Sequence, residues 1–286
     1  MMEEIAKNIF IETGFQGVTV AAIPWSQGQI LIDAPFRSED IRSWRASLVN
    51  LAAGGERILI NLDAHYDRTL GARAMEATLI TQEATASAFR SRPLTFKNQH
   101  LGTGAAWEQG NNLVTTRWAP PEITFDHSIA LHPDGLTLLV DHHPGPMAGS
   151  CWIEIPEEKI VLVGDILMVN QPPFLANADI PAWINSLEEL QSPHFSGYTL
   201  VSGRGGVTSG AAIPPLLEWL KTVQVKIQQL GEKSAPSEET SEWVETFLNV
   251  FQFPSEFKNQ YRDRVKWGLL QNYLHRYFPA RAESDE

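Results

Sequence analysis

The feature that most constrains this chain is a short polar segment, Asp63-x-His65-x-Asp67-Arg68-x-x-Gly71. It follows directly on a short, mostly apolar run at residues 57–61, which is typical of a buried strand. Loops that follow the strands of a rigid scaffold often hold the binding and catalytic side chains of a protein. The segment, called the 63–71 loop below, therefore predicts a polar pocket at the end of a strand.

The composition is that of a globular protein with enough length for a large core. The chain has 286 residues, of which 43% are hydrophobic and 20% are charged. This length favours one large domain with an appendage over two independent domains. The formal net charge of −12 makes nonspecific attraction to nucleic acid or anionic membranes unfavourable, so neither is expected as a partner.

The cysteine count and the N-terminus indicate the cellular compartment. Cys151 is the only cysteine in the sequence, so an intrachain disulfide cannot form. The first residues lack the basic stretch and apolar run of a signal peptide. No uncharged apolar stretch approaches the ~20 residues that a membrane-spanning helix needs. We therefore expect a soluble, cytoplasmic protein.

Strand-like and helix-like segments alternate over the first two thirds of the chain, which favours a layered α/β domain. Strands are expected at residues 8–13, 17–24, 29–35, 57–61, 77–81, 113–116, 123–125, 136–141, 151–156, 160–163 and 198–201. Helices are expected at residues 38–53, 71–75 and 180–190, with Ser38 as the cap of the first.

The pattern changes after about residue 213, where helices replace strands. Residues 214–231 place apolar side chains on one face of a helix, and a polar linker is expected at residues 232–241. A short helix around Trp243 and a longer one from Phe257 follow. The predicted division is an α/β domain over residues 1–212 and a helical extension over residues 213–286, packed on that domain.

Five short segments resemble, in the same order, the motifs of the metallo-β-lactamase superfamily. They are the opening hairpins at residues 8–35, the 63–71 loop, residues 142–150, Gly164-Asp165 and Ser202-Gly203-Arg204-Gly205. The 63–71 loop is similar to the family pattern His-x-His-x-Asp-His-x-x-Gly. The resemblance covers about residues 8 to 206. It implies an α/β layered fold, a four-layer αββα sandwich, with a C-terminal helical extension that covers the site or forms an interface.

The family's metal ligands are only partly present. Its seven ligand positions fall on Asp63, His65, Asp67, Arg68, Pro146, Asp165 and Arg204. Three positions keep the family residue, and an aspartate that replaces a histidine can still bind a metal. A guanidinium has no lone pair to offer, and proline has no donor side chain. The resemblance therefore does not extend to a dinuclear zinc site, and we expect no metal or at most one divalent ion.

The charges at these positions suggest what replaces the metal. Asp63, Asp67 and Asp165 would bring carboxylates into one pocket, where their mutual repulsion would raise their pKa values. Arg68 and Arg204 would bring two fixed positive charges into the same pocket. We therefore hypothesise that guanidinium–carboxylate pairs supply the counter-charge that zinc supplies in the family, with a cost of ~3–5 kcal/mol for breaking one buried pair.

Each of these residues also has a purely structural interpretation. His65 is more simply a hydrogen-bonded pocket histidine than a metal ligand. Asp67 and Asp165 would equally well cap loop amides or pair with arginine. His142-His143 is a weaker candidate for a substitute ligand pair, and Cys151 is expected to be a buried core thiol.

Three functions follow from these observations. In the first, the chain keeps the fold but not zinc hydrolysis, and Arg68 and Arg204 line a cleft that binds an anionic small molecule. In the second, Asp63, His65 and Asp165 hold one Mn, Mg or Zn ion for hydrolysis of an ester, thioester or phosphoester. Asp67 would then be the general base that activates the bound water. In the third, the aromatic-rich C-terminal helices make the chain a non-catalytic scaffold or a homodimer.

Overall fold

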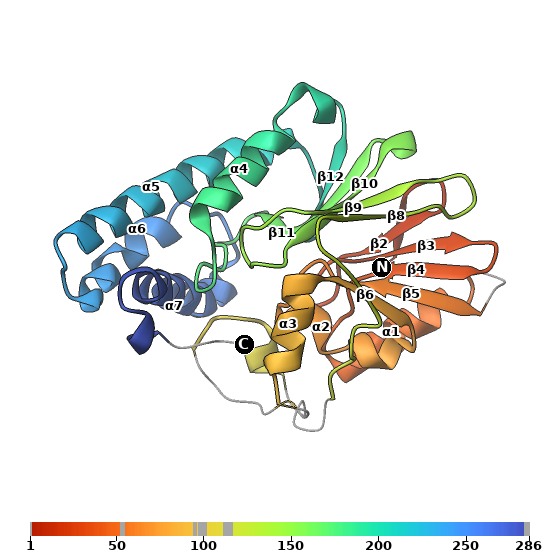
Figure 1. Cartoon of the computed structure of the whole chain (residues 1–286), viewed down its shortest axis with the longest axis horizontal. Coiled ribbons are helices and arrows are strands. Elements are labelled where there is room, and N and C mark those ends of the chain that lie inside the picture. Colours follow the sequence, from red (N-terminus) through yellow and green to blue (C-terminus); the bar gives the residue numbers. More distant parts are fainter. Residues whose placement is uncertain (1, 52–54, 94–95, 97–101, 111–116, 283–286) are drawn as a thin grey trace.

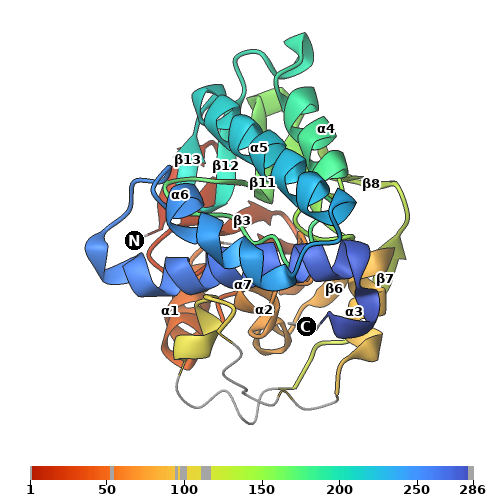
Figure 2. The same ribbon diagram turned by 90° about the vertical axis from the view of Figure 1, so that its left-hand side faces the viewer.

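The computed structural model shows two β-sheets packed face to face between two layers of helices (Figure 1). It describes residues 2–51, 55–93, 96, 102–110 and 117–282. Figure 2, turned by 90°, shows the layers in succession, with α4 and α5 above the sheets and α1 to α3 below them. This arrangement is the predicted four-layer αββα sandwich.

The first sheet has seven strands in sequence order, β1-β2-β3-β4-β5-β6-β7. They are β1 (Glu3–Ala6), β2 (Ile9–Glu12), β3 (Val20–Trp25), β4 (Gly28–Ile32), β5 (Glu56–Ile60), β6 (Thr78–Gln82) and β7 (Ile123–Phe125). The first four strands form antiparallel hairpins, and β4 to β7 pair in parallel. Because parallel strands need crossover connections, helices α1 to α3 lie between them in the sequence.

The second sheet has six strands in the order β13-β12-β11-β10-β9-β8. They are β8 (Ser128–Leu131), β9 (Leu138–His142), β10 (Cys151–Ile155), β11 (Ile160–Met168), β12 (Thr199–Arg204) and β13 (Gly206–Thr208). Only β11 and β12 pair in parallel, and α4 (Ile180–Leu190) is their crossover helix. All nine residues of β11 are buried, as expected for a central strand covered on both faces.

Three apolar clusters hold the layers together. The facing sides of the two sheets meet through Ile30, Ile60, Ile153 and Leu162, among others. On the outer side of the first sheet, Trp44 and Leu48 of α1 (Ser38–Leu48) and Phe89 of α3 (Glu83–Ser91) pack against its strands. On the outer side of the second sheet, Trp183 and Leu187 of α4 pack against Val161 and Val163 of β11. Burying a large apolar side chain contributes about 1.5–3 kcal/mol, so these clusters account for most of the driving force.

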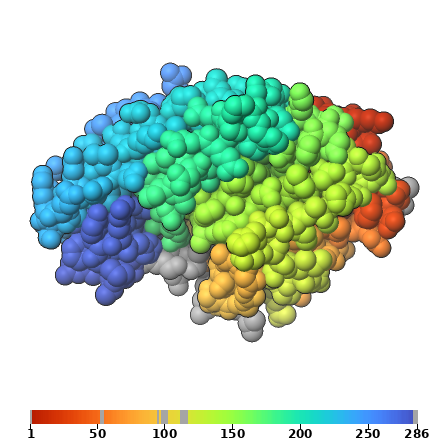
Figure 3. Space-filling model, turned by 45° about the horizontal axis from the view of Figure 1, so that its top comes forward, coloured from red at the N-terminus to blue at the C-terminus, as the bar shows by residue number. Residues whose placement is uncertain are grey.

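The C-terminal helices belong to the same apolar cluster as α4. Helix α5 (Ile213–Glu232) packs on α4, and α6 (Val244–Leu248) packs on α7 (Lys258–Tyr277). The side chains of Leu220, Phe247 and Leu269 are almost fully buried among these helices. Figure 3 shows the helical segments as one continuous surface that adjoins the second sheet. The division at residue 212 stays a prediction.

Several local predictions need correction. The first helix ends at Leu48, and its cap position is Arg37 without a side-chain hydrogen bond, so the expected Ser38 cap is wrong. Residues 237–241 of the expected linker belong to a short 3-10 helix, η6 (Ser237–Trp243). Helix α3 and strands β1, β8 and β13 were not expected from the sequence. The strand expected at residues 113–116 lies outside the described residues.

No helix in the described ranges is both long enough and apolar enough to cross a membrane.

Candidate functional site

The predicted pocket residues come together at one edge of the two sheets. Asp33 follows β4 and the 63–71 loop follows β5, and these two strands are parallel neighbours in the first sheet. Asp165 lies within β11 and Arg204 ends β12, which are parallel neighbours in the second sheet. The carboxyl ends of parallel strands share one sheet edge, which is where α/β folds place their sites.

Irregularities in the second sheet bring Asp165 and Arg204 close together. The pairing of β11 with β12 shifts register between Leu162 and Gly164 and again before Met168. Such bulges change the direction of a side chain at the edge of a site. A Cβ atom on Gly203 would lie 2.8 Å from Asp165 Oδ1 and 2.7 Å from the backbone carbon of Gly164. Glycine at position 203 therefore permits the close approach of β12 to the Asp165 carboxylate.

Arg68, in the short helix α2 (Tyr66–Thr69), lies at the centre of three carboxylates and is fully buried. Its Nη1 donates to Asp33 Oδ2 at 2.6 Å, and its Nη2 donates to Asp165 Oδ1. Its Nε lies 2.9 Å from Asp63 Oδ1, but the angle at that N–H falls outside hydrogen-bond geometry. We therefore treat the contact with Asp63 as an ion pair only.

Arg204 makes a second set of contacts on the other side of Asp165. Its Nε donates to Asp165 Oδ2 at 2.9 Å, and its Nη1 donates to Asp67 Oδ2 at 2.5 Å. Its Nη2 lies 3.0 Å from Nδ1 of His65. The guanidinium carbon is 4.6 Å from the ring centroid of Phe174. Asp165 thus bridges the two arginines, one on each carboxylate oxygen.

Asp67 also fixes a segment that is distant in the sequence. Its Oδ1 accepts from the backbone N–H of Trp107 at 2.7 Å, and its Oδ2 accepts from that of Ala106 at 3.2 Å. These residues lie at the start of the 3-10 helix η2 (Trp107–Gln109). The carboxylate of Asp67 therefore joins the 63–71 loop to η2 and to β12 through Arg204.

The carboxylates divide into two kinds by pKa. Burial alone would raise the pKa of Asp67 and Asp165, but Arg204 beside both, and Arg68 beside Asp165, lower them below the ordinary value. Burial is the larger effect at Asp63, where it raises the pKa to about 7 in spite of Arg68, and it raises the pKa of Asp33 also. The arginines thus hold Asp67 and Asp165 in their ionised forms, while burial shifts Asp33 and Asp63 toward protonation although both contact Arg68.

His65 is neutral in this arrangement. Its Nδ1 accepts from the backbone N–H of Asp67 at 3.2 Å, and the guanidinium of Arg204 can only donate to it. Burial and the charge of Arg204 lower the pKa of His65 to about 3. The ring packs on Phe174 with centroids 4.4 Å apart. The Nδ1 lone pair, which could otherwise bind a metal, is directed at two N–H donors.

The side chains of this cluster do not fit the ligand set of a pair of zinc ions. Zinc needs lone pairs from imidazole and carboxylate groups at ~2.0–2.2 Å. Both oxygens of Asp67 and of Asp165 already accept hydrogen bonds, and two of the family's ligand positions carry guanidinium groups. Within the part of the chain that the structure describes, no three His, Cys, Asp or Glu side chains are arranged to hold a metal ion. The geometry supports no reaction step through a zinc pair.

The architecture is shared with solved structures, although no protein-family model and no curated protein matches the sequence. The metallo-β-lactamase from Pontibacter korlensis matches with a TM-score of 0.62 at 16% identity, over 77% of this chain and 98% of that one. The sec-alkylsulfatase Pisa1 from Pseudomonas sp. gives 0.66 at 14% identity, over 100% of this chain and 52% of the sulfatase. The chain has the metallo-β-lactamase fold.

At these identities the similarity shows the fold alone. The fold that the motifs implied is confirmed, and the chain spans about half the length of the alkylsulfatase. A third match, DIM-1 metallo-β-lactamase, gives a TM-score of 0.59 over 78% of this chain. The shared fold does not supply the chemistry of the residues where the 63–71 loop meets β11 and β12, and that chemistry depends on their own contacts.

The structure brings Asp63, His65, Asp67, Arg68, Asp165 and Arg204 together and leaves the other candidates outside. His142 bonds the carbonyl oxygen of Ala148, and His143 stacks on Trp152, so neither belongs to the cluster. Cys151 is buried between the sheets, as expected. The roles given to the site residues stay predictions, and Arg68 is too deeply buried to reach a ligand directly.

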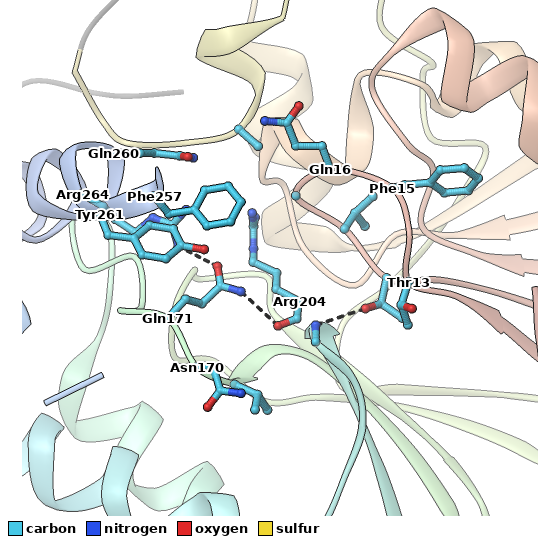
Figure 4. Close-up of a pocket in the computed structure, with 16 residues that line it drawn as sticks. Thr13, Phe15, Gln16, Asn170, Gln171, Arg204, Phe257, Gln260, Tyr261 and Arg264 are labelled. Atoms are coloured by element: carbon cyan, nitrogen blue, oxygen red, sulfur yellow. Dashed lines mark hydrogen bonds between the residues drawn. The ribbon is translucent and has the colours of Figure 1, made fainter. Parts of the chain in front are cut away.

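A cavity of about 360 Å³ lies beside this cluster (Figure 4). Arg204 lines it, but Arg68 does not. Figure 4 shows Gln260, Tyr261 and Arg264 of α7 across from Phe15 and Gln16, which lie in the loop between β2 and β3. The remaining lining includes the amides of Asn170 and Gln171 and the ring of Phe257.

Sequence reasoning missed two charged members of this region. Asp33 lies in a turn that was noted only as the end of a hairpin, and its positive φ of 58° is a local sign of special geometry. Arg264 is buried within α7, more than fifty residues after the last recognised motif, with its guanidinium 3.9 Å from the Phe174 centroid. Its position among helix residues carries no local signal of a site.

Proposed function

We propose that this protein is a member of the metallo-β-lactamase fold that does not perform zinc hydrolysis and that binds a small anionic molecule in the cavity between α7 and the β2–β3 loop. The observation that carries the proposal is the pairing of Arg68 and Arg204 with the carboxylates that would otherwise hold metal. Guanidinium groups stay protonated, so Arg68 and Arg204 keep their positive charges and leave no room for a metal cation.

The charge balance around the cavity favours an anion. Arg68 and Arg204 form ion pairs with carboxylates of the cluster, whereas Arg264 is a third buried arginine beside them. Within the described ranges, the Arg264 guanidinium donates only to neutral oxygens, those of Gly104, Pro172 and the Gln171 side chain. Among the described residues that line the cavity there is no Asp or Glu. Burial and the nearby Arg204 lower the pKa of Arg264 to about 9, and a bound anion would offset both effects.

The metal part of the proposal is tested by elemental analysis. The full chain, purified without chelator and supplied separately with zinc, manganese and iron, should hold less than about a tenth of an equivalent of each metal. A matched control is the variant Asp63→His/Arg68→His/Pro146→His/Arg204→His, which restores the family's ligands and should gain zinc. Near-stoichiometric metal in the natural sequence would overturn the proposal and favour the alternative of a one-metal hydrolase using Asp63, His65 and Asp165.

The ligand part is tested by calorimetry with inorganic phosphate and citrate as probes. Arg264→Gln should weaken binding at least about tenfold, because charge-assisted hydrogen bonds typically contribute about 1.5–3 kcal/mol. The control is Arg262→Gln, which removes the same charge from an exposed position on the same helix. Equal affinity in both variants would rule out the cavity as the anion site. The predicted homodimer and the cytoplasmic location stay separate proposals.

A further inference from the structure

A second and larger cavity has a lining that shares no residue with the first cavity. It has a volume of about 520 Å³, within the range of small-molecule sites. Arg73, Arg90, Arg92, Arg117, Phe89 and Trp118 are among its lining residues. None of these residues lines the first cavity. None belongs to the aspartate–arginine cluster, which is Asp33, Asp63, Asp67, Arg68, Asp165 and Arg204.

The base of this second cavity is an ordered stack of flat groups. The rings of Phe89 and Trp118 are nearly parallel, at 25° with centroids 6.1 Å apart. The buried guanidinium of Arg92 lies 4.5 Å from the centroid of Trp118 and 4.9 Å from that of Phe89. The guanidinium of Arg92 also lies 4.4 Å from the centroid of the Tyr66 ring. Such a base offers both a flat apolar surface and a fixed positive charge.

The rim of the cavity is basic in an otherwise acidic protein. Arg73, Arg90 and Arg117 occur there without any Asp or Glu among the described lining residues, although the whole chain carries a net charge of −12. Arg73 bonds the backbone carbonyl oxygen of Trp118, which is a neutral acceptor, and within the described ranges it pairs with no carboxylate. Arg90 pairs with Glu83, but both side chains are about half exposed, so this pair is weak. Arginine side chains gathered around one hollow favour the binding of an anion.

We propose that this second cavity binds a small aromatic anion, with its flat ring against Trp118 and Phe89 and its phosphate or carboxylate group held by the arginines. The ring of such a ligand would pack on the apolar base of the cavity, and its acidic group would pair with the basic rim. Guanidinium groups bind phosphate and carboxylate with two parallel hydrogen bonds, so Arg73 and Arg117 can each hold one anionic group. This site is independent of the function proposed for the first cavity.

The second cavity also touches the backbone of the 63–71 loop. Arg92 donates through Nη2 to the carbonyl oxygen of Ala64, next to Asp63 and His65. The ring of Tyr66, which lies under Arg92, belongs to α2 together with Arg68. The second cavity is therefore joined through Arg92 to the loop that carries Asp63, His65, Asp67 and Arg68.

The test uses calorimetry on the full chain with phenyl phosphate, phenol and inorganic phosphate as probes. We expect one equivalent of phenyl phosphate to bind at least about tenfold more tightly than either of the other two, because it alone has both the ring and the charge. The double variant Arg73→Gln/Arg117→Gln should weaken this binding at least about tenfold. Both side chains are exposed, so the variant should remain folded.

The control Lys221→Gln/Arg262→Gln removes the same charge from exposed ion pairs on α5 and α7 and should leave the affinity unchanged. A second variant, Trp118→Leu, should reduce the advantage of phenyl phosphate over inorganic phosphate. The proposal is overturned if the natural sequence does not bind phenyl phosphate saturably, or if inorganic phosphate binds equally well. It is also overturned if Arg264→Gln, rather than the double variant, removes binding, since the ligand would then lie in the first cavity.

Discussion

Replacing Arg204 with methionine should destabilise the protein strongly. The methionine keeps much of the apolar stem but removes a guanidinium whose side chain is only 2% exposed. Asp67, which is fully buried, and Asp165, which is 2% exposed, then lose that partner. Removing one partner of a buried ion pair costs about 3–5 kcal/mol, because an uncompensated charge remains in the interior.

The loss should not reach twice that value, because each carboxylate keeps other partners. Asp165 still pairs with Arg68, and Asp67 still accepts from the backbone N–H groups of Trp107 and Ala106. We therefore expect a loss of about 3–5 kcal/mol, which is a large part of the ~5–15 kcal/mol that stabilises a typical domain.

The loss should depend on pH in a defined direction. Asp67 and Asp165 have lowered pKa values in the folded protein, so they stabilise it above the unfolded value near 3.8, and this contribution is lost as the pH falls through their folded values. Without Arg204 their pKa values rise, so at pH 7 the variant holds ionised carboxylates in its interior without that partner, and their protonation as the pH falls removes part of this cost. The difference between the natural protein and Arg204→Met should therefore be largest at about pH 7 and smaller at about pH 4.

Urea unfolding followed by tryptophan fluorescence measures this difference at both pH values. Arg262→Met, which breaks an exposed pair with Glu245, is the control and should cost less than about 1 kcal/mol. The double variant Arg204→Met/Asp67→Asn should recover about 1–3 kcal/mol, because it removes one of the stranded charges. A loss at pH 7 no larger than that of the control, or one equal at both pH values, would refute the reasoning.

Three further predictions concern single positions. Asp63→Asn should be more stable than the natural protein by at least about 1 kcal/mol at pH 8. The pKa of Asp63 is raised to about 7 in the folded protein, so its carboxyl group loses its proton above that pH and the folded state becomes less stable. Urea unfolding across pH measures this difference. Gly17→Ala should lower the melting temperature, with a cost of about 1–3 kcal/mol, since φ is +78° and the new Cβ would lie 2.6 Å from Ala106 Cβ. Cys151 should react with a thiol reagent only after unfolding, because burial raises its pKa and hides the sulfur.

The motifs predicted the fold well because each one lies at the end of a strand. The spacing of the 63–71 loop is set by the exit from β5 into α2, and Asp165 and Arg204 lie on β11 and β12. The periodicity of α4 and α5 was equally clear, since both helices bury one apolar face. Predictions at these places needed only local information.

The sequence could not show which groups pair with which. Asp33 was read as part of a turn, although it holds Arg68 from a position 35 residues earlier. Arg264 enters the region from α7, and its contact with Gly104 spans 160 residues. The short helix α3 was missed because it has only nine residues and Phe89 is the only large apolar side chain on its buried face, beside Thr85 and Ala86.

The pairing of Arg204 with Asp67 across 137 residues, and of Arg68 with Asp165 across 97, has a consequence for folding. These charges can leave water only after both sheets have formed and met, so we expect the pairs to be absent from the transition state for folding. Interactions that form after the transition state slow unfolding and hardly affect the folding rate. We therefore expect the cluster to form late in folding and to set the unfolding rate, and so the lifetime of the native state, whether or not a ligand occupies the cavity beside it.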